Sequence, residues 1–247
     1  MSLTQTAGVV NELIALDSVD STNLELARRI LAGNLPNFSL VVAREQTAGL
    51  GRLGRGWVSE PGTSISASLY LKSRHTQELG WATLIAATAI RSSVAELVAD
   101  EVLVKWPNDV LVNDKKISGI LAQIQPDGSL VLGFGINLKA QLGAPETATA
   151  LDLLGVDADM DTVLHAVIRN FRIRWAIFEQ DPKASIAKAR AELLQHSATI
   201  GKTVRAELPG GGEVLGVAKD IDGEGRLVIL TPEPVAVSAA DVWHLRN

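Results

Sequence analysis

The chain has 247 residues, of which 47% are hydrophobic and 21% are charged, a composition that fits a folded protein with one main domain and a small satellite rather than a disordered chain. The net charge of −5 argues against broad contact with a nucleic-acid backbone, so any phosphate site must be local. There is no cysteine, no secretory leader pattern at the N-terminus and no apolar run near the roughly 18 residues that span a bilayer, so we expect a cytoplasmic protein without disulfides, thiol chemistry or a membrane anchor.

The first third of the chain is expected to form a helix followed by short strands. Thr22 followed by Glu25 is typical of a capping box, and apolar residues at helical spacing then run to Gly33. Two strands are predicted by runs of β-forming residues, and the second alternates strictly and should be half-buried: residues 38–43 and 64–71. Between these strands, residues 44–56 form a loop rich in glycine and arginine.

The middle of the chain predicts a core helix and an antiparallel meander. Apolar residues at helical spacing cover residues 81–98. Strands are then predicted where short apolar runs alternate with turn residues, at 102–106, 110–112, 116–124 and 130–138. Pro107 ends the first of these strands, because proline cannot donate a hydrogen bond to a sheet.

The last third predicts two helices and then a small β domain. One helix starts at Asp161, and a second starts at Asp181-Pro182 and ends near His196. Short alternating runs follow Gly201, at residues 204–208, 213–221, 227–230 and 235–237. We therefore expect a main domain at residues 1–197 and a small all-β domain at residues 198–247.

The segment Gly49-Leu-Gly-Arg-Leu-Gly-Arg-Gly56 is a candidate phosphate loop. Closely spaced glycines let backbone N–H groups approach an anion, while Arg52 and Arg55 offer charge-assisted contacts to phosphate or carboxylate. The segment matches neither the P-loop nor the dinucleotide fingerprint, because alternating strand sequence follows it. By itself it is equally well interpreted as a glycine-rich surface loop.

A second group of polar residues surrounds a predicted hairpin, Lys105-Trp-Pro-Asn-Asp109 and Lys115-Lys-Ile-Ser-Gly119. Lysines at the end of one strand and the start of another can converge on one point, where Asp109 would bind magnesium or orient an amine. A solvated hairpin is the alternative, and we favour it for Lys115. Pairing with the arginine loop favours the functional interpretation for Lys105 and Lys116.

Two further motifs stand at a helix start and in a strand, Asp20-Ser-Thr-Asn23 and Gly133-Phe-Gly-Ile-Asn137. The hydroxyls and free N–H groups of the first can bind a ligand, although helix capping also explains Thr22. The second lets a backbone approach a ligand closely, or marks a bulge.

The ordered set of these motifs resembles the biotin protein ligase family. The resemblance covers about Leu16 to Leu138, and the terminal β segment is similar to the family's small SH3-like domain. It implies an α+β fold, with a mixed, largely antiparallel sheet flanked by helices as in class II aminoacyl-tRNA synthetases and biotin ligases. Residues 1–197 would then be the catalytic, biotin- and ATP-binding domain.

The resemblance implies an ATP-dependent, AMP-forming ligase. Such an enzyme activates biotin as biotinyl-5′-AMP and transfers it to a lysine of the carboxyl carrier domain of a biotin-dependent carboxylase, with Mg²⁺ assisting. The catalytic residues would be Arg52, Lys105, Asp109 and Lys116. The biotin contacts would be Ser21, Thr22, Asn23, Gln46, Gly49, Leu50, Gly51, Arg52, Lys116 and Gly119. The ATP and adenylate contacts would be Arg52, Arg55, Trp57, Lys105, Asn108, Lys116 and Asn137, with Asp109 as the magnesium ligand.

Two departures from the family pattern are visible. Leu50 stands where the family loop commonly has its first arginine. Leucine is harmless if that position contacts ligand through its backbone, but retention of the adenylate is weaker if a guanidinium is needed. Some members also carry an N-terminal DNA-binding domain, and too few residues precede Asp20 for one, so we expect a monomeric or homodimeric ligase that does not bind DNA.

Two other functions stay open at this point. A lipoate ligase or octanoyltransferase has a similar domain, and some of these proteins share the Lys105–Asp109 motif, although the glycine-arginine loop through Trp57 favours biotin. A non-catalytic biotin-sensing regulator is the second alternative, and the acidic net charge counts against DNA binding.

Overall fold

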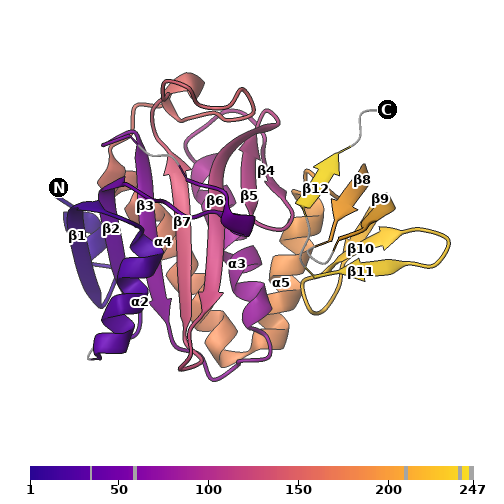
Figure 1. The fold of residues 1–247 in the computed structure, drawn as a ribbon, viewed down its shortest axis with the longest axis horizontal. Coiled ribbons are helices and arrows are strands. Elements are labelled where there is room, and N and C mark those ends of the chain that lie inside the picture. Colours follow the sequence, from indigo (N-terminus) through magenta and orange to yellow (C-terminus); the bar gives the residue numbers. More distant parts are fainter. Residues whose placement is uncertain (34, 58–59, 209–210, 239–240, 245–247) are drawn as a thin grey trace.

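The computed structural model describes residues 1–33, 35–57, 60–208, 211–238 and 241–244, and its described strands form two sheets (Figure 1). The larger sheet has seven strands in the order β1-β2-β3-β7-β6-β5-β4. Their bounds are β1 Glu12–Val19, β2 Ser39–Gln46, β3 Ser64–Leu71, β4 Val102–Lys105, β5 Asp109–Val112, β6 Lys115–Ile124 and β7 Leu130–Asn137. Only the β1–β2 pair among these is parallel, so the sheet is mixed and largely antiparallel, as expected.

Helices cover the two faces of this sheet unequally (Figure 1). One face packs against the layer formed by α3 Ala82–Ala95, α4 Met160–Gln180 and α5 Pro182–Gln195. The other face carries α2 Thr22–Ala32 over β2, β3 and β7, and leaves the β6, β5 and β4 end uncovered by helix. The short segments are α1 Thr4–Ala7, η1 Arg52–Gly54, η2 Leu79–Trp81 and η3 Asp152–Leu154.

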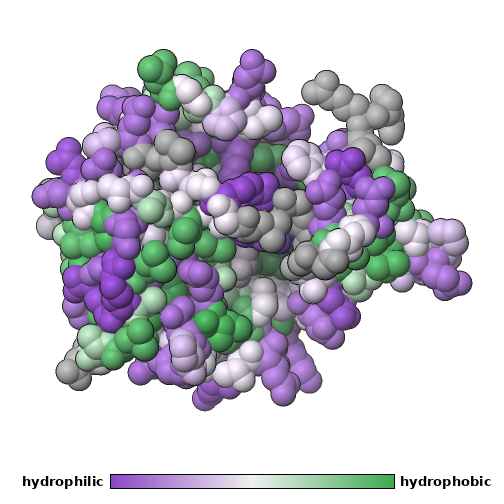
Figure 2. All heavy atoms as spheres, viewed as in Figure 1, coloured by the Kyte–Doolittle hydropathy of each residue, from purple (hydrophilic) through white to green (hydrophobic). Residues whose placement is uncertain are grey.

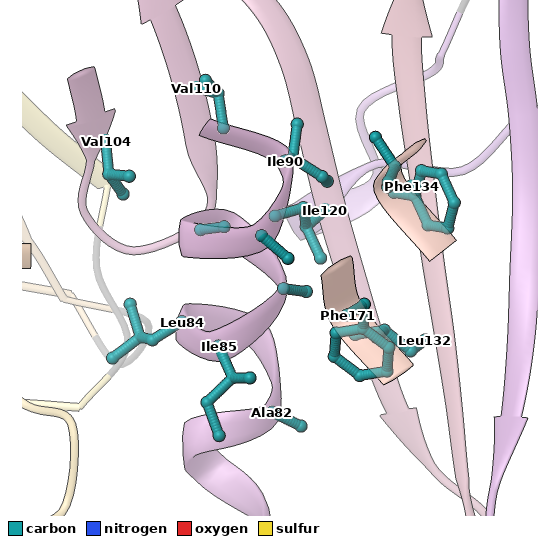
Figure 3. Close-up of a cluster of buried hydrophobic side chains, with 14 of the residues drawn as sticks. Ala82, Leu84, Ile85, Ile90, Val104, Val110, Ile120, Leu132, Phe134 and Phe171 are labelled. Atoms are coloured by element: carbon teal, nitrogen blue, oxygen red, sulfur yellow. The ribbon is translucent and has the colours of Figure 1, made fainter. Parts of the chain in front are cut away.

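The main hydrophobic core lies between the sheet and the three-helix layer. Figure 3 shows Ile85 and Ile90 on α3 and Ile120, Leu132 and Phe134 on the strands beside it, and all five belong to one cluster of buried side chains. All five side chains are buried, with exposed fractions of 6% or less. Removing this much apolar surface from water is the main favourable term in folding, at about 25 cal/mol per Å².

The smaller sheet follows α5 and has the strand order β11-β10-β9-β8-β12. Its strands are β8 Thr203–Glu207, β9 Glu213–Ile221, β10 Leu227–Leu230, β11 Val235–Val237 and β12 Asp241–His244. Two buried tryptophans fasten its β9–β10 turn to the larger part. Trp81 Nε1 donates to the Gly223 carbonyl at 2.8 Å, and Trp106 Nε1 donates to the Gly225 carbonyl at 3.0 Å.

The predicted helices, meander and C-terminal strands are present, but three local expectations are wrong. Helix α2 has Ser21 rather than Thr22 at its N-cap, and the expected capping box does not form, because the Thr22 hydroxyl donates to Gln46 instead. Strand β3 is buried along its whole length rather than half-buried, since α2 covers its polar face. Helix α4 is capped by Asp159, whose carboxylate accepts from Thr162 N, so the helix starts before Asp161.

The helix α1, the strands β1 and β12 and the three short 3-10 segments η1, η2 and η3 were not predicted. The division of the chain at residue 197 stays a prediction, although β8 begins close to it. No helix in the described ranges is both long enough and apolar enough to cross a membrane.

Candidate active site

A pocket of about 1110 Å³ opens on the sheet face that helices leave uncovered, and it is bounded on one side by the smaller sheet. Figure 2 shows hydrophilic residues gathered at the centre of this face, over η1, beside the hollow between the two parts of the molecule. Strands β4 to β7 form the floor of the pocket, and the segment 50–57 forms part of its wall.

One end of the pocket is built from uncharged polar groups at the start of α2. The Gln46 side-chain carbonyl accepts from Thr22 N at 2.8 Å and from Thr22 Oγ1 at 3.0 Å. The Ser68 hydroxyl lies 2.6 Å from Asn23 Oδ1 and 2.7 Å from Thr22 Oγ1. Asn23 Nδ2 donates to Gln123 Oε1 at 2.7 Å. These bonds fix the side chains, so this end is preorganised for a ligand with amide-like donors and acceptors.

The carboxylate of Asp20 anchors the turn that precedes α2. It accepts from Ser21 N at 2.7 Å and from both terminal guanidinium nitrogens of Arg28 at 2.8 Å. The hydrogen bonds from Arg28 and Ser21 lower the pKa of Asp20 to about 2. Asp20 is therefore ionised at neutral pH and holds Ser21 at the pocket.

Glycines on β6 and β7 make room for side chains that lie across the floor. A Cβ atom at Gly133 would lie 2.0 Å from Asn23 Oδ1, and one at Gly135 would lie 2.2 Å from Trp57 Cζ2. A Cβ at Gly119 would lie 2.8 Å from Lys116 Nζ and 3.2 Å from Trp57 Cζ3. Gly133 and Gly135 therefore leave no room for a larger residue unless Asn23 or Trp57 is displaced, whereas at Gly119 the flexible end of the Lys116 side chain would have to shift.

The glycine-arginine loop folds back on itself as a narrow hairpin. Trp57 N donates to the Gly49 carbonyl at 2.9 Å, and Gly51 N donates to the Arg55 carbonyl at 2.6 Å. Arg52 Nη1 donates to Asn108 Oδ1 at 3.2 Å, which ties the loop to the β4–β5 turn. The loop thus brings Arg52 to the Lys105–Asp109 motif, although 56 residues separate Arg52 from Asn108 in sequence.

Charged groups meet at the centre of the floor. Lys116 Nζ lies 2.7 Å from Asp109 Oδ1, and the two side chains are 35% and 22% exposed. Lys116 Nζ also lies 5.7 Å from the centre of the Trp57 ring, within range of a cation–π interaction. Lys105 pairs with Asp109 across β4 and β5, so its side chain starts on the same face of the sheet.

The wall opposite α2 comes from the smaller sheet and the linker before it: Gly201, Lys202, Thr203, Val242, Trp243 and His244. The His244 ring is held near buried Thr199, with Nε2 3.4 Å from Thr199 Oγ1. Burial, followed by the charges of Lys105 and Lys202, lowers the pKa of His244, whereas Asp114 acts in the opposite direction.

Most residues singled out from the sequence line this pocket: Ser21, Thr22, Asn23, Gln46, Leu50, Gly51, Arg52, Arg55, Trp57, Lys105, Asn108, Asp109, Lys116 and Gly119. Gly49 packs against the backbone of Trp57, where a Cβ would lie 2.4 Å from the carbonyl oxygen, and does not line the pocket. Asn137 borders a second, smaller hollow, where its amide donates to the Thr149 carbonyl at 2.8 Å. The functional roles of all these residues stay predictions.

Several residues that line or support the pocket had not been singled out from the sequence. Ser68 and Gln123 lie on predicted strands and hold Asn23, but nothing in their spacing marks them as site residues. Trp243 and His244 come from the smaller sheet and Lys202 from the linker before it, and only the three-dimensional arrangement places them here.

No group of three or more histidine, cysteine or acidic side chains in the described part of the chain is arranged to hold a metal ion. Asp109 and Asp114 are the acidic side chains among the residues that line the pocket. This arrangement suits Mg²⁺ only if substrate phosphates supply further ligands, which is how that ion is commonly bound.

Comparisons with known families agree with this geometry. Residues 15–139 match the Biotin/lipoate A/B protein ligase family, and residues 199–245 match the Biotin protein ligase C terminal domain. The second match includes every described strand of the smaller sheet.

Individual proteins align over almost the whole chain. A biotin–[acetyl-CoA-carboxylase] ligase of Mycobacterium tuberculosis is 39% identical over 247 residues, covering 95% of this chain and 90% of the relative. The bifunctional ligase/repressor BirA of Bacillus subtilis is 31% identical, covering 95% of this chain and 74% of the relative. The biotin protein ligase of Aquifex aeolicus in complex with biotin and ATP superposes with a TM-score of 0.81 at 28% identity, covering 96% of this chain and 100% of that structure.

Proposed function

The chain belongs to the biotin protein ligase family, and from that premise we propose that it activates biotin with ATP and transfers the biotinyl group to a lysine of a carboxyl carrier domain. The observation that carries the proposal is the composition of one pocket. An uncharged, preorganised end built from Thr22, Asn23 and Gln46 is continuous with a cationic centre at Arg52 and Lys116.

The uncharged end suits the ureido group of biotin, which offers N–H donors and a carbonyl acceptor. Ser21, Thr22, Asn23 and Gln46 present hydroxyl and amide groups there. The glycine floor leaves space for the apolar tail beside Trp57. The biotin carboxylate would then point toward Arg52 and Lys116, and their positive charges would hold it.

In the first step a carboxylate oxygen of biotin attacks the α-phosphorus of ATP. The bond between that phosphorus and the oxygen that bridges it to the β-phosphate breaks, and pyrophosphate leaves with the electron pair. Negative charge grows on the phosphoryl oxygens in the transition state. Lys116, Arg52 and Arg55 would stabilise it, because fixed positive charges in a partly enclosed pocket act strongly on developing charge.

In the second step the neutral amine of the acceptor lysine attacks the acyl carbon of biotinyl-AMP. An amide bond forms, the carbon–oxygen bond to the phosphate breaks, AMP leaves, and the amine loses a proton. Asp109 lies 2.7 Å from Lys116 Nζ, so it can orient Lys116 or the incoming amine at this position. Leu50 pairs with Gly56 through its backbone, so the loop keeps its hairpin shape without an arginine there.

Magnesium would arrive with the nucleotide and neutralise charge on its phosphates. Asp109 is the acidic side chain at the centre of the pocket, and phosphate oxygens and water would complete its coordination. Lys105 at the end of β4 and Asn108 in the β4–β5 turn would contact the phosphates. Trp57, which lines the pocket, and Asn137, which borders the second hollow, are proposed to contact the adenylate.

Lipoate ligases and octanoyltransferases remain the nearest alternative, because the Biotin/lipoate A/B family includes them. The match of residues 199–245 to the C-terminal domain of biotin protein ligases favours biotin. We propose a cytoplasmic enzyme, monomeric or homodimeric, that does not bind DNA.

The test is incubation of the purified protein with biotin, Mg²⁺ and ATP labelled at the α-phosphate, followed by chromatography of the products. We expect labelled biotinyl-AMP, and biotinylation once a carrier domain is added. Lys116→Ala and Arg52→Ala should each reduce adenylation by about 100-fold or more, the usual effect of removing one group that stabilises transition-state charge.

Lys188→Ala is the matched control, because Lys188 is exposed on α5 and does not line the pocket. Parallel reactions with lipoate and octanoate separate the alternatives. Adenylation of lipoate in preference to biotin, or full activity in both pocket variants, would contradict the proposed function.

A further inference from the structure

Two buried polar atoms beside the floor of the pocket have no hydrogen-bond partner among the described residues. They are Ser66 Oγ on β3 and Trp57 Nε1 in the glycine-arginine loop. A polar atom that is removed from water without a partner is unfavourable, so each such atom in a native protein calls for a physical reason. Because both atoms belong to segments around the pocket, the reason to examine is a bound ligand.

The sheet register brings these two atoms to the same place. Ser66 pairs with Gly135 across β3 and β7, and paired residues carry their side chains on the same face of a sheet. A Cβ at Gly135 would lie 2.2 Å from Trp57 Cζ2 and 2.8 Å from Trp57 Nε1, so the indole lies directly over that glycine. The opposite edge of the indole reaches Gly119 on β6, where a Cβ would lie 3.2 Å from Cζ3. The N–H edge therefore lies on the side away from β6, which is the side of β3 and Ser66.

The next serine along β3 differs from Ser66 in having partners. The Ser68 hydroxyl lies 2.6 Å from Asn23 Oδ1 and 2.7 Å from Thr22 Oγ1, so the start of α2 satisfies it. Ser66 is two residues earlier, so its side chain starts on the same face, and it is 1% exposed. Its hydroxyl is therefore fixed beside the floor and is available to a ligand that extends from the neutral end of the pocket.

Ser66 lies between the neutral end and the cationic centre of the pocket. Asn23 lies over Gly133, which precedes Gly135 by two residues on β7, so the glycines under Asn23 and Trp57 are about 6.8 Å apart. Lys116 Nζ lies over Gly119, the partner of Gly135 on β6. Since β7 separates β6 from β3, Gly119 lies about 9.6 Å from Ser66 across the floor.

The part of biotin that spans this interval contains one polar atom. With the ureido group at Asn23 and the carboxylate at Lys116, the ring between them lies beside Ser66, and that ring contains a thioether sulfur. A thioether sulfur is polarizable and is a weak hydrogen-bond acceptor, so it can accept from an O–H and an N–H group. The ring reaches the two atoms by displacing the edge of the indole, which lies over glycine and whose Nε1 has no hydrogen bond to the described residues.

We propose that Ser66 Oγ and Trp57 Nε1 form the subsite for the thioether sulfur of biotin, which makes Ser66 a specificity-determining residue. This inference rests on the proposed function, because it assigns one atom of biotin to one place in the same pocket. It leaves both chemical steps unchanged, since the sulfur takes no part in adenylation or transfer.

The experiment combines a change in the protein with a change in the ligand. Isothermal titration calorimetry measures the Kd of biotin and of desthiobiotin, which keeps the ureido ring and the carboxylate tail but lacks the sulfur. We expect Ser66→Ala to weaken biotin binding by about three- to tenfold, the size of one neutral hydrogen bond, and to change desthiobiotin binding much less. Trp57→Phe, which keeps an aromatic ring without the N–H group, should also reduce the preference for biotin over desthiobiotin.

Ser118→Ala is the matched control. Its hydroxyl is also buried and lacks a partner among the described residues, but Ser118 precedes Gly119 on β6 and so faces away from the pocket. Both affinities should stay at the wild-type value in this variant. Ser66→Thr keeps the hydroxyl and should retain the preference for biotin, which a role in packing alone would not predict.

Ser66→Ala removes a hydroxyl that has no partner among the described residues, so the variant should fold like the wild type, which circular dichroism checks. Equal losses of affinity for the two ligands in Ser66→Ala, or no loss for biotin, would overturn the inference. A wild-type protein that binds neither ligand would instead refute the proposed function.

Discussion

The glycine at position 133 has a sharp steric consequence for the neutral end of the pocket. A Cβ there would overlap Asn23 Oδ1 at 2.0 Å, and Asn23 cannot swing away without losing its bonds to Ser68 and Gln123. Gly133→Ala should therefore weaken biotin binding by about tenfold or more, since misplaced polar partners are left unsatisfied. Isothermal titration calorimetry with biotin alone measures this effect directly.

Gly223→Ala provides the control, because a Cβ at Gly223 would meet no atom within 4 Å and the residue is outside the pocket. Its biotin affinity should equal that of the wild type. If Gly133→Ala also binds biotin with wild-type affinity, Asn23 is not a biotin contact.

Among the single residues of the pocket, the charged ones could be predicted from the sequence, whereas the polar residues that hold other side chains in place could not. Arg52, Lys105 and Lys116 could be selected because they stand in motifs with an unusual local composition. Ser68 and Gln123 could not, because each is an ordinary polar residue of an alternating strand and acquires its role only when α2 packs above it. The expected capping box failed for the same reason, since Gln46 takes the Thr22 hydroxyl from the helix end.

Among the elements, the contact between β4 and the smaller sheet depends on Trp106. This side chain is buried, and its Nε1 donates to the Gly225 carbonyl at 3.0 Å. Trp106→Phe removes that donor and leaves the part-buried Gly225 carbonyl without it, so the free energy of unfolding should fall by about 1 kcal/mol beyond the loss of ring volume. Urea denaturation followed by circular dichroism provides the measurement.

Trp175→Phe is a matched comparison for this loss. Trp175 is also buried, but its Nε1 has no hydrogen-bond partner within the described residues, so the same substitution removes ring volume and an unpaired donor without breaking a hydrogen bond. Trp106→Phe should be the more destabilising of the two. Equal losses would mean that the bond to Gly225 does not contribute to stability.

The two strands that the sequence did not predict, β1 and β12, lie at the edges of the two sheets. Strand β1 contains Glu12 and Asp17, and β12 contains Asp241 and His244, so neither shows a clean apolar alternation. Edge strands need only one partner and often carry charges that prevent aggregation, which weakens the pattern. The meander was predictable because β5, β6 and β7 are inner strands with apolar runs separated by turns.

For the whole molecule, composition predicted that any phosphate site would be local, and the residues proposed to bind phosphate lie in one pocket of an acidic chain. The share of this pocket that belongs to the smaller sheet was not predictable. It depends on the linker pairing with β4, and one backbone contact between distant segments has no signal in local sequence.

The stability of the whole molecule should depend on histidine ionisation between pH 7 and 5.5. Burial lowers the pKa of His196, with Arg91 as the next cause, and burial with Lys105 and Lys202 lowers the pKa of His244. Near the usual value of 6.5 the unfolded chain therefore takes up protons that the folded chain does not. The contribution of these two histidines to the free energy of unfolding is fully present above pH 6.5. It is lost as the pH drops from 6.5 toward their lower pKa values in the folded state.

Aspartates with lowered pKa values, such as Asp20 and Asp222, destabilise the fold only in more acidic solution, so the window above pH 5.5 isolates the histidines. Urea denaturation at several pH values should show a wild-type free energy of unfolding that declines across this window. His196→Gln combined with His244→Gln should flatten the decline, because neither glutamine takes up a proton in either state. A double variant that loses stability as steeply as the wild type would show that other groups control the response.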